Sequence, residues 1–185
     1  MADTPSNMLP LGTKAPDFSL FDTVSETTLH LSKLKGEIGT LIMFICNHCP
    51  FVIHINNEII SIANEYVDKG INFIAISSND VVKYPMDSPE KMKIHAKNEH
   101  YPFPYLYDET QEVAKAYDAA CTPDFYVFDK KLKLTYRGQL DDSRPGNNQQ
   151  ITGKDIRHAL DCLVENKVNL ELQKPSIGCS IKWKS

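Results

Sequence analysis

Two short apolar runs, residues 41–45 and 71–77, most constrain how this chain can fold. Neither run alternates between apolar and polar residues, which indicates strands covered on both faces, as in a parallel sheet beneath helices. Between them, apolar residues recur with the helical period from Val52 to Tyr66, and Gly70 ends the segment. The order strand, helix, strand predicts a right-handed β-α-β unit at the centre of the fold.

Weaker patterns predict further elements on both sides of this unit. In chain order they are a hairpin from residues 18–21 and 27–31, a helix over 88–97 that begins at Ser88, a short strand over 105–107, a helix capped by Asp108 or Thr110 that runs to Tyr117, a hairpin from 125–128 and 132–136, and a last helix opened by an approximate capping box of Thr152 and Asp155. The predicted fold class is α/β, with a central mixed sheet flanked by helices and an N-terminal β-hairpin extension.

The length and the hydrophobic content fit a single core. The chain has 185 residues, of which 42% are hydrophobic, and this suffices for one domain. We expect that domain to span residues 10–168 and to be followed by an aperiodic tail over residues 169–185. No stretch approaches the length of a membrane span, and the first ten residues lack the positive charge and apolar run of a signal peptide. We therefore expect a soluble cytoplasmic protein without a membrane partner.

The charged residues and the cysteines narrow the classes of function. There are 24 acidic and 20 basic residues with no dense basic block, which argues against a nucleic-acid partner. Five cysteines, an odd number, do not resemble the disulfide framework of a secreted scaffold. Reactive thiols or metal ligands are the better interpretations.

The sequence Cys46-Asn47-His48-Cys49 lies where a buried strand leads into a helix. The free N–H groups at a helix N-terminus favour an anion, and a thiol there can have its pKa lowered from about 8.5 to between about 3.5 and 7.5. We assign nucleophilic attack to Cys46, as the more exposed cysteine, and expect Cys49, one turn inward, to be the resolving thiol. The alternative is a pair of buried cysteines that act only as small apolar residues.

His48, between the two thiols, is a candidate tuning residue. When protonated, it would stabilise a thiolate on Cys46 and make the disulfide more oxidising. The alternative is an exposed loop histidine without a role.

The C-x-x-C at a strand–helix junction, followed far downstream by Thr122-Pro123 before a strand, resembles the thioredoxin superfamily. In that superfamily the second feature is a cis-proline loop that faces the C-x-x-C. The resemblance implies that the backbone of Thr122 and Pro123 lines the substrate groove beside Cys46. Without it, Thr122-Pro123 would indicate an ordinary turn.

Other segments resemble the redoxin branch of this superfamily, which includes peroxiredoxins and membrane-tethered thiol reductases. They are residues 12–20, Lys35-Gly36, residues 121–129 and a Gly-Cys-Ser-Ile-Lys-Trp tail at residues 178–183, which is similar to a peroxiredoxin-like group. The resemblance spans roughly residues 10–183. It implies the thioredoxin-like fold and a thiol-dependent redox class. We expect a thiol–disulfide oxidoreductase without a cofactor that acts on protein or small-molecule disulfides, has a thioredoxin or glutathione system as its reducing partner, and can form a homodimer.

The chain departs from two patterns of these relatives. Peroxiredoxins place their reactive cysteine in Pro-x-x-x-Thr-x-x-Cys, and neither Cys46 nor Cys49 fits this frame. An antioxidant peroxidase, with Arg137 or Arg144 activating the peroxide in another geometry, is therefore an alternative rather than the first hypothesis. The buried acid of thioredoxins would fall at Thr40, and Asp80 could replace it through a water molecule.

The other three cysteines give further hypotheses. Cys121, just before the predicted cis-proline, either pairs with a cysteine of the C-x-x-C in some redox state or is a core residue. Cys179, in the tail, is a candidate extra resolving thiol, reached within the chain or across a second subunit. Cys162 follows the inward pattern of the last helix and is most simply a core residue.

Two non-redox alternatives stay open. Cys46, Cys49 and a histidine, either His48 or His54, could hold Zn or Cu(I). A closed zinc site usually has four ligands, and the sequence has no second C-x-x-C. The other alternative is a binding module of the same fold with incidental cysteines.

Overall fold

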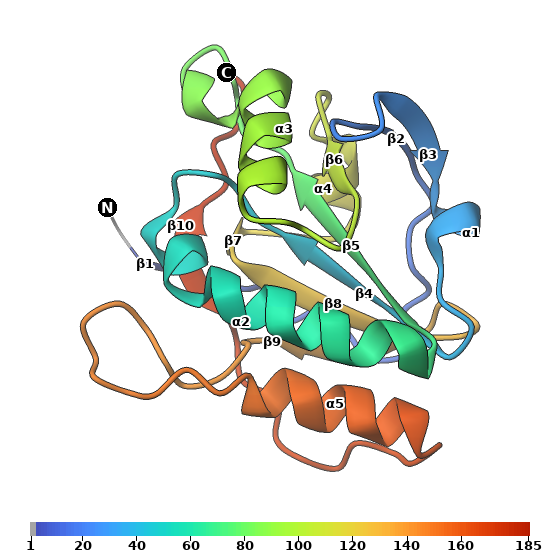
Figure 1. Cartoon of the computed structure of the whole chain (residues 1–185). Helices are drawn as coiled ribbons and strands as arrows, with labels where there is room; N and C mark the ends of the chain where they lie inside the picture. The colour runs from blue at the N-terminus through green and yellow to red at the C-terminus, as the bar shows by residue number, and fades with distance from the viewer. Residues whose placement is uncertain (1–2) are drawn as a thin grey trace.

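A computed structural model describes residues 3–185 as two sheets with helices on both faces of the larger one (Figure 1). The larger sheet has the strand order β3 (Thr27–His30), β2 (Ser19–Asp22), β6 (Tyr105–Tyr107), β5 (Ile71–Ser77), β4 (Gly39–Phe44), β8 (Asp124–Asp129) and β9 (Leu134–Gly138). The smaller sheet has the order β1 (Asp3–Pro5), β10 (Ile177–Ser180) and β7 (Cys121–Thr122). The predicted α/β class with a central mixed sheet is confirmed.

The central β-α-β unit forms as the apolar runs predict. β4 pairs parallel to β5, from Gly39 opposite Ile71 to Phe44 opposite Ile76, and antiparallel to β8 on its other edge. Every residue of β4 is buried, which explains why its sequence does not alternate. Helix α2 (Pro50–Tyr66) connects the two strands, and a 3-10 turn (Val67–Lys69) leads to Gly70 in the left-handed conformation.

The two faces of β4 pack against different helices. Leu41 and Met43 belong to a core cluster with residues of α2, α3 (Pro89–Asn98) and α5 (Lys154–Val164). Ile42 and Phe44 belong to a second cluster with residues of α1 (Leu31–Leu34) and α4 (Glu112–Ala116). The sheet is therefore the middle layer of a sandwich, with α2 lying across one face (Figure 1).

Several predicted boundaries are wrong for local reasons. β9 begins at Leu134 and not at residue 132, because the Asp129 carboxylate accepts the N–H groups of Lys131 and Lys133 and holds the preceding residues in a turn. Helix α4 begins after Gln111, although the Asp108 carboxylate still accepts two N–H groups of its first turn.

The capping box predicted for α5 does not form. The N-cap of α5 is Gly153, and the Asp141 carboxylate accepts the N–H groups of Thr152 and Gly153 from outside the helix. The Ser88 cap of α3 is confirmed, since its hydroxyl accepts the Lys91 N–H.

The segment expected to be an aperiodic tail contains β10, which pairs antiparallel with both β1 and β7. Its four residues, Ile-Gly-Cys-Ser, are too few and too irregular to show a strand pattern. Figure 1 shows this red strand packed against the body of the fold beside the start of α2. Within residues 3–185, no helix combines the length and apolarity that crossing a membrane requires.

Candidate functional site

The two cysteines of the C-x-x-C lie between β4 and α2. Cys49 is the N-cap of α2, with extended backbone angles, and Pro50 takes the first helical position. Cys46 lies two residues beyond β4. We expected the helix to start near Cys49, with Cys49 further inward than Cys46, and Cys49 is indeed the residue at the helix N-terminus. Both side chains are buried, with 2% of Cys46 and none of Cys49 exposed.

The Thr122–Pro123 peptide bond is cis, as the resemblance implied, and Thr122 contacts both thiols. The Cys49 sulfur lies 3.1 Å from the Thr122 carbonyl oxygen. The Cys46 sulfur lies 3.6 Å from the Thr122 hydroxyl oxygen. A strand more than 70 residues downstream therefore completes the thiol site.

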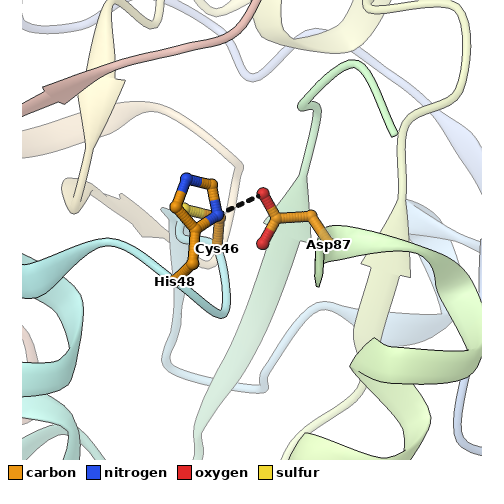
Figure 2. Close-up of side chains that lie close together, drawn as sticks. All are labelled: Cys46, His48 and Asp87. Atoms are coloured by element: carbon orange, nitrogen blue, oxygen red, sulfur yellow. Dashed lines mark ion pairs between the residues drawn. The ribbon is translucent and has the colours of Figure 1, made fainter. Parts of the chain in front are cut away.

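His48 lies against a buried carboxylate that sequence reasoning missed (Figure 2). Its Nδ1 atom is 2.8 Å from Oδ2 of Asp87, which is fully buried. Asp87 also accepts the Asn47 N–H at 2.9 Å and the Asn79 amide at 2.8 Å. The His48 ring stacks on Tyr84, with ring centroids 5.7 Å apart, so it is held in place and is not a free loop histidine.

One signal could have pointed to Asp87. The carboxyl ends of the parallel strands β4 and β5 lie at the same edge of the sheet, so the loop that follows β5 must pass near the C-x-x-C. That loop carries both Asp80 and Asp87. The sequence alone does not show which of the two turns toward the thiols.

Asp80, the expected substitute for the thioredoxin acid, has other partners. One of its carboxylate oxygens accepts the N–H groups of Val82 and Lys83 within its own turn. The other oxygen lies 3.8 Å from the Lys83 ammonium group. The carboxylate that approaches the cysteines is that of Asp87.

The pair of thiols loses one proton readily and keeps the other in a hydrogen bond between the two sulfurs. A hydrogen bond from Cys46 is the largest effect that lowers the pKa of Cys49, to about 5, and the contact with Cys179 acts in the same direction. The same hydrogen bond, together with burial and the nearby Asp87 charge, raises the pKa of Cys46 well above its usual range. At neutral pH the pair therefore holds one thiolate, stabilised by the hydrogen bond between the two sulfurs.

The remaining two candidate cysteines lie on the smaller sheet. The Cys179 sulfur, on β10, is 3.0 Å from the Cys49 sulfur, and its side chain is buried. Cys121 precedes Thr122 on β7, and its thiol donates to the Pro123 carbonyl oxygen at 3.7 Å. Because neighbouring residues of a strand point to opposite faces, Cys121 is directed away from the pair that Thr122 contacts. Burial raises the pKa of Cys121, as expected of a core cysteine.

The arginines suggested for a peroxidase are used elsewhere. Arg137 donates to the Leu9 carbonyl oxygen and to the Gln173 side chain. Arg144 donates to backbone oxygens of its own loop and to Gln139. Neither has a hydrogen bond to a cysteine among the contacts of residues 3–185.

Three donors could approach a metal ion together. One atom each from Cys46, His48 and Asp87 lie within 4.8 Å of one another. The Asp87 oxygens already accept hydrogen bonds from Asn47 and Asn79, so a cation would have to compete with these contacts. His54, the other histidine considered, instead lies 2.8 Å from the Ser143 hydroxyl.

Comparisons with known proteins identify the family and the fold of this chain. The family model described as Redoxin matches residues 10–155. An uncharacterized conserved protein from Geobacillus kaustophilus is 60% identical over 100% of this chain and 97% of its own, with a TM-score of 0.98. A hypothetical protein from Sinorhizobium meliloti is 44% identical over 98% of this chain and 99% of its own, with a TM-score of 0.95.

A more distant structure shares the fold. The thioredoxin domain of a thiol-disulfide oxidoreductase from Bacteroides vulgatus is 19% identical over 87% of this chain and 99% of its own, with a TM-score of 0.62. The search of curated proteins found no match. The redoxin match covers most of the chain, including the C-x-x-C and the cis-proline. The chain therefore belongs to the redoxin family and has a thioredoxin-like fold.

Proposed function

We propose that this protein is a thiol–disulfide oxidoreductase that alternates between a Cys46–Cys49 dithiol and the corresponding disulfide. The observation that carries the proposal is the pair of thiols at the start of α2, one of them with a pKa of about 5, in contact with the cis Thr122–Pro123 loop. A thiolate is the species that attacks a disulfide, and the pair holds one at neutral pH.

The reaction uses both sulfurs in turn. Cys46 attacks one sulfur of the substrate disulfide while its proton passes to the Cys49 thiolate, and the other substrate sulfur leaves as a thiolate. Cys49 then gives up that proton to solvent or to the departing thiolate. Its sulfur attacks Cys46, which forms the Cys46–Cys49 disulfide and releases the second substrate thiolate. Two electrons pass from the dithiol to the substrate.

Cys46 is the attacking sulfur in this scheme because it lies on the more open side of the pair. It neighbours His48, whose side chain is 25% exposed, whereas Cys49 has no exposed surface. When protonated, His48 brings a positive charge that offsets Asp87 and the developing charge on Cys46. The substrate class we propose is protein or small-molecule disulfides, with a thioredoxin or glutathione system as the source or acceptor of electrons.

A peroxidase ranks second. The cysteine frame differs from that of peroxiredoxins, and Arg137 and Arg144 are engaged with the backbone and with glutamines. Metal binding by Cys46, His48 and Asp87 ranks third, because Asp87 already has hydrogen-bond donors.

The test is to expose reduced protein to oxidised glutathione and to locate the resulting bonds by mass spectrometry in the wild type, Cys46→Ser, Cys49→Ser and the matched control Cys162→Ser. The proposal expects a first disulfide between Cys46 and Cys49 that dithiothreitol reverses, and a glutathione adduct that accumulates on Cys46 in Cys49→Ser. Thiols that stay free in every variant would refute it. If a glutathione adduct instead accumulates only on Cys49, in the Cys46→Ser variant, then Cys49 is the attacking thiol and Cys46 the resolving one. Rapid sulfenic acid formation with hydrogen peroxide alone would favour the peroxidase.

A further inference from the structure

β10 is fixed tightly against the thiol site. It pairs on one edge with β7, with Cys179 opposite Thr122, and on the other edge with β1, with Cys179 opposite Asp3. A Cβ atom on Gly178 would lie 2.0 Å from the Thr122 carbonyl oxygen, so only glycine permits this approach of the two backbones. The position of Cys179 is thus set by the fold and is not that of a residue on a loose arm.

The position of Cys179 gives Cys49 a second sulfur neighbour. The sulfurs of Cys49 and Cys179 are 3.0 Å apart, and a disulfide bond is about 2.05 Å long, so they need to close by only roughly 1 Å. Cys49 is hydrogen-bonded to Cys46 as well. It therefore contacts two other thiols, of which only Cys46 belongs to the C-x-x-C motif.

We propose, building on the oxidoreductase function above, that Cys179 is a third redox thiol that takes the disulfide over from Cys46. The Cys179 thiolate attacks the Cys49 sulfur of the Cys46–Cys49 disulfide. The Cys49–Cys179 bond forms, the Cys46–Cys49 bond breaks, and Cys46 leaves as a thiolate that takes up the proton lost by Cys179. The step is an exchange within the chain, so it consumes no oxidant or reductant beyond the substrate disulfide that formed the first bond.

The electrostatics agree with this order of events. Burial and the contact with Cys49 raise the pKa of Cys179 to about 12 in the reduced protein, so Cys179 keeps its proton and does not compete with Cys46 for substrate. Formation of the first disulfide removes the negative charge on Cys49, and with it one cause of that raised pKa. The Lys182 ammonium group, which acts in the opposite direction, remains. Cys179 therefore becomes more acidic only after the C-x-x-C has been oxidised.

The exchange has a consequence for the site. Cys46 is returned as a free thiol while the protein stays oxidised, and β10 is bonded covalently to the start of α2. Reduction then has to act on a buried bond at Cys49 and Cys179 rather than on the bond that borders His48. In the proposed exchange, Cys46, the thiol that attacks the substrate, is therefore free again. The disulfide that a reductant has to cleave lies elsewhere, between Cys49 and Cys179.

Peptide mapping distinguishes the two disulfides. Trypsin yields one peptide over residues 36–69, which holds Cys46 and Cys49, and another over residues 168–182, which holds Cys179. The reduced protein is exposed to oxidised glutathione for increasing times, quenched in acid, labelled with N-ethylmaleimide and digested. We expect an early product in which peptide 36–69 carries an internal disulfide. A later product should link the two peptides, with the label on Cys46.

Three variants sharpen the result. Cys179→Ser and Cys179→Ala should lose the cross-linked product and keep the internal disulfide, while the control Cys162→Ser should form both products as the wild type does. The inference is overturned if the wild type keeps the internal disulfide with Cys179 fully labelled at all times. If Cys46 and Cys49 never lose their label, the proposed function itself fails, which is a different outcome in the same experiment.

Discussion

Replacing Cys46 by alanine tests whether a shared proton sets the acidity of Cys49. The hydrogen bond from Cys46 is the largest of the effects that lower the pKa of Cys49 to about 5, and alanine removes it without adding a polar group. The contact with Cys179 remains in the variant. The Cys49 thiol is therefore expected to become less acidic, although it should stay more acidic than an ordinary cysteine.

The size of the change follows from the strength of such a bond. A hydrogen bond to a charged group contributes about 1.5–3 kcal/mol, and about 1.36 kcal/mol corresponds to a change of one in pKa. Cys46→Ala should then raise the pKa of Cys49 by roughly one to two. At pH 5, the fraction of Cys49 present as thiolate should fall from about one half to between about one tenth and one hundredth.

The measurement is the ultraviolet absorbance of the thiolate over an acidic pH series, with Cys162→Ala as the control. Cys121, Cys162 and Cys179 all have raised pKa values, so they contribute little signal at acidic pH. A midpoint that stays near 5 in Cys46→Ala would refute the shared proton. A thiolate signal that is lost altogether in Cys46→Ala but keeps its midpoint near 5 in Cys49→Ala would instead place the thiolate on Cys46.

Three further predictions concern the elements that support the site. Asp87→Ala leaves the Asn47 N–H without its acceptor and should lower the free energy of unfolding by about 1–3 kcal/mol in urea titrations, while Asp87→Asn, which retains an acceptor oxygen, should lose less. Gly178→Ala forces β10 away from the Thr122 carbonyl oxygen and should cost about 1–3 kcal/mol in the same assay, and it should also slow formation of any bond to Cys179. Burial raises the pKa of Asp124 to about 8, above the ordinary value near 3.9, so the folded protein holds a proton that the unfolded chain releases. The contribution of Asp124 to the free energy of unfolding should be present below about pH 4 and be lost as the pH rises through 8. In Asp124→Asn the free energy of unfolding should fall less steeply over this range. An equally steep fall in the variant would contradict this assignment.

The sequence predicted the centre of the fold because its signals are local. The buried runs that become β4 and β5, and the helical period of α2, each report on residues within one element. The placement of the C-x-x-C at the end of the first run followed directly from them. The cis-proline came from the resemblance, since Thr122-Pro123 alone has no local pattern that distinguishes it from a turn.

The parts of the site that were missed depend on contacts between distant segments. β10 is a strand because Asp3–Pro5 and Cys121–Thr122 supply its partners, and four residues without alternation cannot show this. Asp87 reaches His48 through a 3-10 turn (Pro85–Asp87) whose position depends on where β5 ends. The helix start near Cys49 was predicted correctly, because Pro50 and the helical period that follows it are local signals.

The arrangement of β10 limits the direction from which a substrate can reach the thiols. The backbone of Thr122 is already paired with Cys179, so an extended polypeptide could pair with that strand edge only after displacing β10. The His48 side has no such obstacle, because the ring is partly exposed and stacks on Tyr84, which is itself 37% exposed. A small or flexible disulfide that reaches Cys46 from there would not have to displace β10. Removal of β10 should therefore change reactivity toward folded protein disulfides far more than reactivity toward oxidised glutathione. Equal effects on both would mean that β10 does not control access to the site.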